Sequence, residues 1–165
     1  MRLHARHALA AALLLLAATA ASAAEVTVNF IKPDSYNDLP RMARDRELIL
    51  KDLREHFVKL GQSLPAGQTL KIDVNDIDLA GRLEPARRID DIRILNGGAD
   101  WPHMALHYSL EADGKVLRSG DGQLSNMNYI QRLNRYSEGD SLRYEKQMLD
   151  DWFQATFTES KLSKK

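Results

Sequence analysis

Two histidines four residues apart, His103 and His107, have the spacing with which helices bind zinc. They alternate with Met104, Leu106 and Tyr108, however, and this period of two predicts a strand. Four strand residues at about 3.3 Å each would separate the two imidazoles by roughly 13 Å. A single zinc ion, with Zn–N bonds of about 2 Å, is difficult for both to reach. We therefore interpret both as solvent-facing strand histidines.

Three aspartates, Asp73, Asp76 and Asp78, form the densest group of carboxylates in the chain. Hard cations such as calcium bind several oxygen atoms, but this group does not match the EF-hand pattern of oxygen ligands and glycine. The nearby arginines that could neutralise the aspartates are Arg82, Arg87 and Arg88. The sequence predicts a charged strand rim or a surface ion-pair cluster, and divalent-metal binding is the alternative.

Motifs of nucleophilic or phosphate chemistry are missing from the sequence. No cysteine is present, no serine lies in Gly-x-Ser-x-Gly, and neither Gly-x-x-x-x-Gly-Lys nor Gly-x-Gly-x-x-Gly occurs. A cofactor-free hydrolase with two carboxylates stays an alternative, because such partners need not be adjacent in sequence. His56 lies between apolar positions of a predicted helix and suggests no function. Aromatic side chains concentrate at binding surfaces. The better candidates for a binding role are therefore Trp101, Tyr129, Tyr136 and Tyr144; the alternative is that they pack beneath loops.

The N-terminus has the pattern of a cleaved signal peptide. Arg2 and Arg6 precede an uncharged run over residues 8–21 that is rich in alanine and leucine, and a small-residue cleavage pattern follows it. This apolar run has about 14 residues, whereas a bilayer span needs about 20, so a transmembrane anchor is disfavoured. We expect cleavage after Ala23 or Ala24 and a soluble periplasmic protein without a membrane anchor.

The charge of the chain argues against nucleic-acid binding. The 165 residues include 23 basic and 23 acidic side chains, 44% hydrophobic residues and no cysteine, whereas phosphate-backbone binding requires a basic surface. Without residues 1–24 the chain has 141 residues, with 21 basic and 23 acidic side chains. A domain of this size forms a core without disulfides. The lack of cysteine also excludes a lipid anchor, a thiol nucleophile and thiolate metal sites.

Hydrophobic periodicity predicts the elements of the first half. Apolar residues alternate over residues 26–31, which predicts a strand, and a helical pattern follows over residues 41–60, with Gly61 as its expected C-cap. The next predicted strand, residues 70–79, changes its apolar phase at residues 75–76. A β-bulge there would leave the three aspartates facing solvent.

The second half begins with a short predicted strand over residues 92–94. Two longer strands, residues 103–110 and 115–124, flank Asp113-Gly114, which predicts a type I′ hairpin turn. That turn places Leu110 opposite Leu117 on the core face, and it places Ser109 opposite Arg118 on the solvent-exposed face. A final helix is expected over residues 141–157.

The predicted order β-α-β-β-β-β-α indicates an α+β two-layer sandwich: a mainly antiparallel sheet with two helices on one face. We expect a cleaved signal peptide over residues 1–24, a single domain over residues 25–158 and a flexible basic tail over residues 159–165. A twofold dimer through an exposed sheet edge is compatible with this fold, but nothing in the pattern requires it.

Three segments together resemble a known family. They are Asp-Ile-Asp-Leu-Ala-Gly at residues 76–81, Asn-Met-Asn-Tyr at residues 126–129, and residues 142–153, which begin Leu-Arg-Tyr-Glu-Lys and end Asp-Trp-Phe. Their order and spacing resemble the bacterial exported family called domain of unknown function 3016, over residues 26–157. The family pattern has an acid where this chain has Asn126. Because the family is uncharacterised, the resemblance implies a periplasmic domain and no particular activity.

The sequence therefore predicts a non-enzymatic binding or envelope-accessory domain, with no cofactor and with an envelope protein or periplasmic ligand as partner. If the aspartates at the strand end face the loop of residues 126–129, the two segments form one polar surface. The residues expected to form the binding surface are Asp76, Asp78, Arg82, Trp101, Asn128, Tyr129, Arg143 and Tyr144.

Overall fold

The computed structural model describes residues 23–36, 38–84 and 92–158. The expected tail, Arg87, Arg88 and all but the last two residues of the expected signal peptide lie outside these ranges. Within them, no helix is long and apolar enough to cross a membrane.

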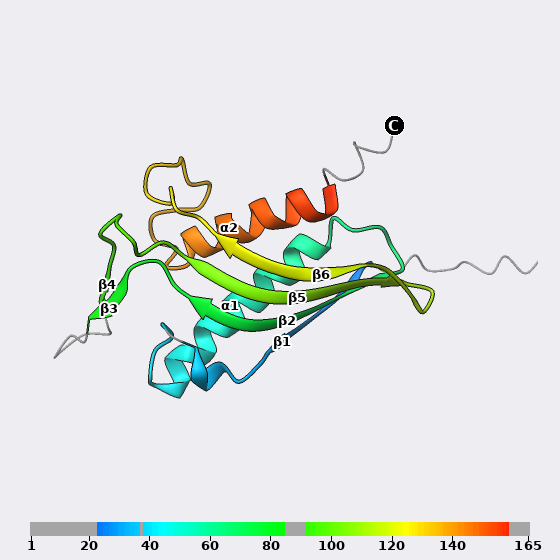
Figure 1. The fold of residues 1–165 in the computed structure, drawn as a ribbon, viewed down its shortest axis with the longest axis horizontal. Helices are drawn as coiled ribbons and strands as arrows, with labels where there is room; N and C mark the ends of the chain where they lie inside the picture. The colour runs from blue at the N-terminus through cyan, green and yellow to red at the C-terminus, as the bar shows by residue number, and fades with distance from the viewer. Residues whose placement is uncertain (1–22, 37, 85–91, 159–165) are drawn as a thin grey trace, which may run out of the picture.

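One four-stranded sheet organises the described part of the chain, in the order β1-β2-β5-β6 (Figure 1). The β1–β2 pair is parallel, with α1 as the connection, and the other two pairs are antiparallel. The short strands β3 and β4 pair separately. The elements are β1 (Glu25–Phe30), η1 (Pro33–Ser35), α1 (Ala43–Gly61), β2 (Gln68–Asp78), β3 (Arg82–Glu84), β4 (Ile92–Ile94), β5 (His103–Ala112), β6 (Lys115–Ser125), α2 (Arg143–Phe153) and η2 (Gln154–Thr158).

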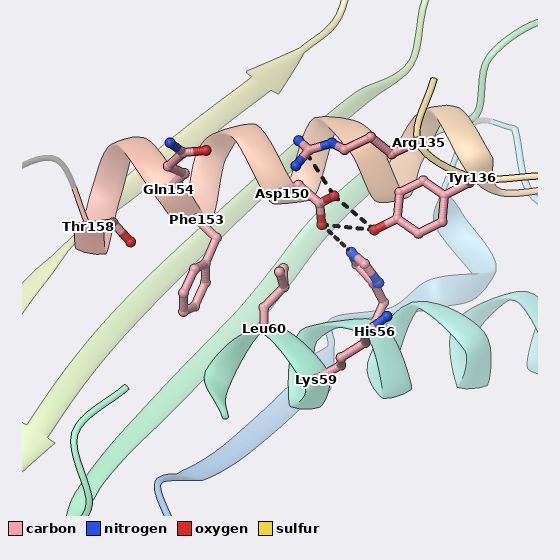
Figure 2. Close-up of a pocket in the computed structure, with 9 residues that line it drawn as sticks. All are labelled: His56, Lys59, Leu60, Arg135, Tyr136, Asp150, Phe153, Gln154 and Thr158. Atoms are coloured by element: carbon pink, nitrogen blue, oxygen red, sulfur yellow. Dashed lines mark hydrogen bonds and ion pairs between the residues drawn. The ribbon is translucent and has the colours of Figure 1, made fainter. Parts of the chain in front are cut away.

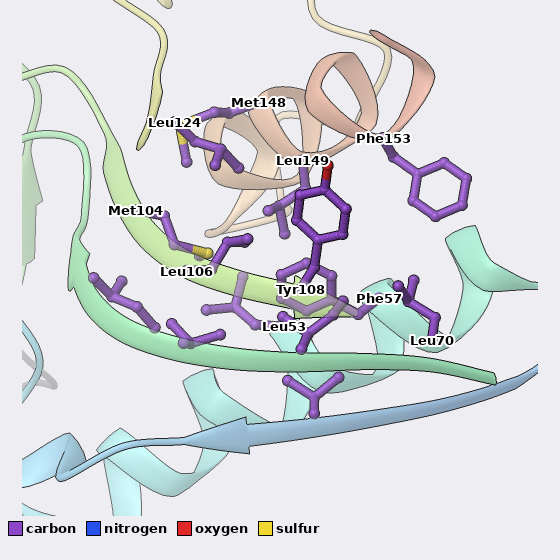
Figure 3. Close-up of a cluster of buried hydrophobic side chains, with 14 of the residues drawn as sticks. Leu53, Phe57, Leu70, Met104, Leu106, Tyr108, Leu124, Met148, Leu149 and Phe153 are labelled. Carbon is purple, nitrogen blue, oxygen red and sulfur yellow. The ribbon is translucent and has the colours of Figure 1, made fainter. Parts of the chain in front are cut away.

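Both helices pack on the same face of the sheet, which confirms the α+β class. Side chains of α1 such as Phe57 and of α2 such as Leu149 meet strand residues such as Leu70 and Leu106 in one core (Figure 3). All four are at most 1% exposed. Alternation in the strands sends every second side chain into this core, so the remaining ones lie on a face that no described helix covers. We call this helix-free side of the sheet the open face.

The predicted bulge in β2 is confirmed. The register shifts between Val74 and Asp76, so Val74 before the bulge and Ile77 after it are both fully buried. The same shift leaves Asp76 and Asp78 on the open face with Asp73. One extra residue therefore keeps two runs of opposite phase in a single strand.

The hairpin between β5 and β6 corrects the predicted pairing. Asp113 and Gly114 have φ angles of 50° and 71°, as a type I′ turn requires. An irregularity two residues later shifts the register, so Leu110 pairs with Arg118. Leu117, expected opposite Leu110 in the core, is 54% exposed. The bulge adds one residue to β6, and Ser109 consequently pairs with Ser119 rather than Arg118.

Gly61 also differs from its prediction. It is the last residue of α1 and does not cap the helix in a left-handed conformation; the C-cap is Gln62, with φ −60°. A β-carbon at Gly61 would lie 2.1 Å from Cγ2 of Val26 in β1. Because it has no side chain, the glycine allows α1 to approach β1 closely.

Two further elements differ from the sequence prediction. Strand β3 had no predicted counterpart, because its sequence, Arg-Leu-Glu, has a single apolar residue and so shows no alternation, unlike Ile-Arg-Ile in β4. The final helix is α-helical only as far as Phe153, and the π-helical segment η2 continues it to Thr158.

Candidate functional site

The open face is strongly acidic. Its cross-strand neighbours in the central row are Asn29, Asp73, His107 and Asp121, one from each strand of the sheet. The Asn29 amide donates to Asp73 at 2.8 Å, and Nδ1 of His107 lies 2.7 Å from Asp121. Strand register alone brings these residues together, since adjacent strands lie about 4.8 Å apart.

Other charged groups extend this surface toward both ends of the sheet. Lys71 forms an ion pair with Glu111 at 2.8 Å, and Asp78 lies 3.8 Å from Nδ1 of His103. Burial raises the pKa of the Asp78 carboxyl, and nearby Asp76 raises it further, although His103 acts in the opposite direction. Among the strand residues described, the open face has one lysine, Lys71, against the acids Glu25, Asp73, Asp76, Asp78, Glu111 and Asp121.

Despite its acidity, the open face offers no recognisable metal centre. Across the described ranges, no group of three or more histidine, aspartate or glutamate side chains lies close enough together to hold a metal ion. The strand prediction for His103 and His107 is confirmed, because both lie on β5 four positions apart. The arrangement presents negative charge over an area rather than converging on a point.

The residues expected to form one binding surface are divided between the open face and the end of the domain. Asp76 and Asp78 are on the open face, and Trp101 lies beside it, its ring 5.4 Å from that of His103. Arg82 is exposed and pairs with Glu84 at 2.8 Å. Asn128 is exposed in the loop after β6.

The two tyrosines of that set lie inside the domain. Tyr129 and Tyr144 are 1% and 7% exposed, and their rings pack edge to face at 4.8 Å. The Tyr129 hydroxyl donates to Asp100 at 2.9 Å; burial and this bond raise its pKa to about 12. Arg143 stacks over the Tyr144 ring at 4.7 Å and donates to its hydroxyl. These tyrosines form a small second core with Ala80.

Glu145 joins two of the three segments that resemble the family, residues 76–81 and 142–153. Its carboxylate is fully buried and accepts the backbone N–H of Ala80 at 2.9 Å and a guanidinium N–H of Arg93. Arg93 also donates to the carbonyl oxygens of Ala80 and Ser141. Next to Ala80, Gly81 has φ 78°, and a β-carbon there would lie 2.2 Å from a backbone oxygen of Ile94. These bonds hold the end of β2 against α2, so this junction is structural.

A second site lies between α1 and α2, where polar side chains meet around Asp150 (Figure 2). Nε2 of His56 lies 2.9 Å from one carboxylate oxygen, and the Tyr136 hydroxyl lies 2.8 Å from the other. Arg135 approaches to 3.8 Å. The His56 ring is 5.7 Å from the Tyr136 ring, in an edge-on orientation.

The protonation states in this network follow from the environment of Asp150. Burial alone would raise its pKa, but the bonds from His56 and Tyr136 and the charge of Arg135 outweigh burial, so the pKa lies below its usual value. An ionised carboxylate only accepts hydrogen bonds, hence Nε2 of His56 carries a proton and Tyr136 donates. Burial and Asp150 raise the pKa of Tyr136, which keeps its hydroxyl protonated.

The His56–Asp150 network borders a pocket of about 410 Å³. Its apolar lining comes from Leu60 and Phe153, and its cationic side chains are Lys59 and Arg135. Arg135 also lies 3.5 Å from Asp151. The side-chain ammonium of Lys59 forms no hydrogen bond or ion pair with any residue in the described ranges. The only carboxylate in the lining, Asp150, is already surrounded by donors.

Sequence reasoning missed His56 and Asp150 as partners, because 94 positions separate them. One signal was present: His56 lies on the same helical face as Leu53 and Phe57, so its imidazole had to be buried and had to find a partner. The partner's identity depends on how α1 and α2 pack.

Comparisons with known proteins identify a family without an assigned activity. The family model described as "Protein of unknown function (DUF3016)" matches residues 24–155. No curated protein matches the chain. The chain is similar to the crystal structure of protein XCC0632 from Xanthomonas campestris, of family DUF330, with 14% identity and a TM-score of 0.36. That match covers 86% of this chain and 87% of the other.

Proposed function

The chain belongs to the DUF3016 family of proteins of unknown function, and we propose that it is a non-enzymatic periplasmic domain that binds a basic partner in the cell envelope. The observation that carries this proposal is the charge of the open face, where six acidic side chains accompany one lysine. Complementary charge steers association and selects partners. A surface rich in lysine and arginine is the partner that this face fits.

The open face suits reversible contact rather than a permanent interface. Its side chains are polar and well exposed, as shown by Asp121 at 82% and His107 at 47%. Obligate interfaces are more hydrophobic. Trp101, half-buried beside His103, adds an aromatic contact at the edge of the same surface. We therefore expect binding that weakens as ionic strength rises.

Catalysis by paired carboxylates has less support. Glu145 is fully buried and bonded to Ala80 and Arg93, and Asp150 is bonded to His56 and Tyr136. A general acid or base must be within hydrogen-bond reach of its substrate. The hydrogen bonds of both carboxylates hold α2 against neighbouring segments of the domain.

The periplasmic part of the proposal is supported by Arg2, Arg6 and the apolar run that follows them. It is tested by the intact mass of the protein released from the envelope of expressing cells. Cleavage after Ala23 or Ala24 predicts a mature chain that begins at Ala24 or Glu25. Recovery of the full-length chain from the cytoplasm would contradict export.

Binding is tested with hexalysine as the probe and hexaglutamate as its charge-reversed counterpart, by titration calorimetry at low and at physiological salt. We expect hexalysine alone to bind. The double variant Asp78→Asn, Asp121→Asn should weaken binding roughly fivefold, because exposed ion pairs contribute below about 1 kcal/mol each. The matched control is Glu47→Gln, Glu55→Gln, which removes the same charge from exposed positions of α1. Equal weakening by both variants would refute binding at the open face.

A further inference from the structure

We propose that the pocket between α1 and the α2–η2 segment binds a small organic anion with an apolar tail. The anionic group would lie between Lys59 and Arg135, and the tail would lie against Leu60 and Phe153 (Figure 2). This site is separate from the open face, because both helices lie on the opposite side of the sheet. A negative result at this pocket would therefore leave the proposed function of the open face unaffected.

Charge in the pocket favours an anion. Asp150 is the only acid in the lining, and His56, Tyr136 and Arg135 already surround its carboxylate. The ammonium of Lys59 has no hydrogen-bond or ion-pair partner among the described residues. It therefore gains an ion pair when an anion enters, without first breaking one. Charge-assisted hydrogen bonds of this kind are about twice as strong as neutral ones.

The apolar part of the pocket lining accounts for the apolar tail of the ligand. Phe153 is 4% exposed and belongs to the core cluster, so its ring is held rigidly at the pocket wall. Leu60 is partly buried and packs against the same cluster. A pocket of about 410 Å³ lies within the usual range for small-molecule sites, roughly 300–1,000 Å³. A carboxylate or phosphate ester with a tail of about six carbons matches this combination of volume and lining.

A neighbouring hollow is less suited to an anion. On the other side of His56 and Tyr136 lies a space of about 270 Å³. Its lining includes Asp52 and Asp140, which both accept from Lys146. Lys59 lines this space as well, but Glu55 brings the number of carboxylates in its lining to three, and its other lysine, Lys146, is already paired. The first pocket has Asp150 as the only acid in its lining and is therefore the space in which an anion is favoured beside Lys59.

The site is held in place before a ligand arrives. The bond from His56 to Asp150 ties α1 to α2, and Tyr136 ties the preceding loop to the same carboxylate. Both helices therefore keep their relative position when the pocket is empty of ligand. A rigid site loses less entropy on binding than a mobile one.

The experiment titrates the full mature chain with four probes: hexanoate, hexyl phosphate, hexanol and hexylammonium. Binding is followed by NMR chemical shifts up to about 10 mM, a range that detects weak sites. We expect hexanoate and hexyl phosphate to bind, with shifts in α1 near Lys59 and in η2. Hexanol should bind at least tenfold more weakly and hexylammonium not at all. If hexyl phosphate alone binds, the ligand class is a phosphate ester; if hexanoate alone binds, it is a carboxylate.

Two matched lysine variants test the anion contact. Lys59→Met keeps the apolar stem of the side chain but removes the charge, and should weaken anion binding at least fivefold while leaving hexanol unchanged. Lys51→Met removes the same charge two turns earlier on α1, where Lys51 is 69% exposed and lies 3.8 Å from Glu55. It should change nothing. Hexanol binding as tightly as hexanoate, no binding by either anion, or equal effects of the two variants would each overturn the proposal.

Discussion

Asp38 provides a quantitative test of the electrostatics at the end of β2. Its Oδ2 atom is buried and has no hydrogen-bond partner among the residues that the structure describes, and the acids Asp78 and Glu145 lie near it. Burial, followed by repulsion from Asp78, raises its pKa from 3.8 to about 6, although Arg93 acts in the opposite direction. The folded state therefore holds a proton on this carboxyl at pH values where the unfolded chain has lost it.

The sign of the pH effect follows from linkage. A carboxyl whose folded pKa is raised stabilises the fold below the unfolded pKa and loses that contribution as pH rises through the folded value. A shift of about two units corresponds to about 3 kcal/mol, and solvent screening of a partly exposed group reduces this to about 1.5 kcal/mol. Stability attributable to Asp38 should thus fall between about pH 4 and pH 6.

Asp38→Asn removes this titration. At pH 7.5 the variant should be more stable than the wild type by about 1.5 kcal/mol, and the advantage should shrink by about 1 kcal/mol at pH 4.5. Urea unfolding at both pH values, followed by tryptophan fluorescence, measures the difference directly. Comparing variant with wild type cancels the titration of all other groups.

A second aspartate in the same segment supplies the control. Asp34 is 81% exposed and forms an ion pair with Arg46. Asp34→Asn removes the same charge but loses a favourable contact, so it should destabilise the fold at pH 7.5 by up to about 1 kcal/mol. Opposite signs for the two variants are expected. If Asp38→Asn is also destabilising at pH 7.5, or its pH dependence equals that of the wild type, the assignment of a protonated buried acid is refuted.

Two further predictions concern packing. Glu145→Ala leaves the partly buried guanidinium of Arg93 without its carboxylate and should cost about 3 kcal/mol in chemical denaturation; Glu145→Gln keeps an acceptor and should cost less, and equal losses would contradict a role for the charge. Gly61→Ala, which helix propensity alone would make stabilising, should destabilise by about 1–3 kcal/mol because its β-carbon meets Val26. Adding Val26→Ala should recover part of this loss, and a stabilising Gly61→Ala would contradict the close approach of α1 to β1.

Much of the fold was predictable because its signals are local. A few neighbouring residues are enough to predict the alternation in β2, its bulge before Asp76 and the turn at Asp113. The pairing beyond that turn was not predictable, because the irregularity at Leu117 leaves no separate mark in the apolar pattern. Gly61 illustrates the same limit: its sequence position suggests a cap, and its actual neighbour, Val26, lies 35 positions earlier in the chain.

The acidic surface was likewise predictable only in part from the sequence. Sequence alone determined that Asp76 and Asp78 face away from the core, because strand alternation dictates it. Only the register of the strands decided that Asp121 of β6 shares that face with them. The extent of the acidic surface is therefore a tertiary property.

What the sequence determined by itself was the family, the α+β class and the absence of thiol chemistry, since each depends on composition, periodicity or the order of short segments. Only the tertiary structure decided that Tyr129 is buried and that His56 meets Asp150 beside a pocket lined by Lys59. The physical reason is that burial and hydrogen bonding are settled by the packing of distant segments, which the local pattern of side chains does not encode.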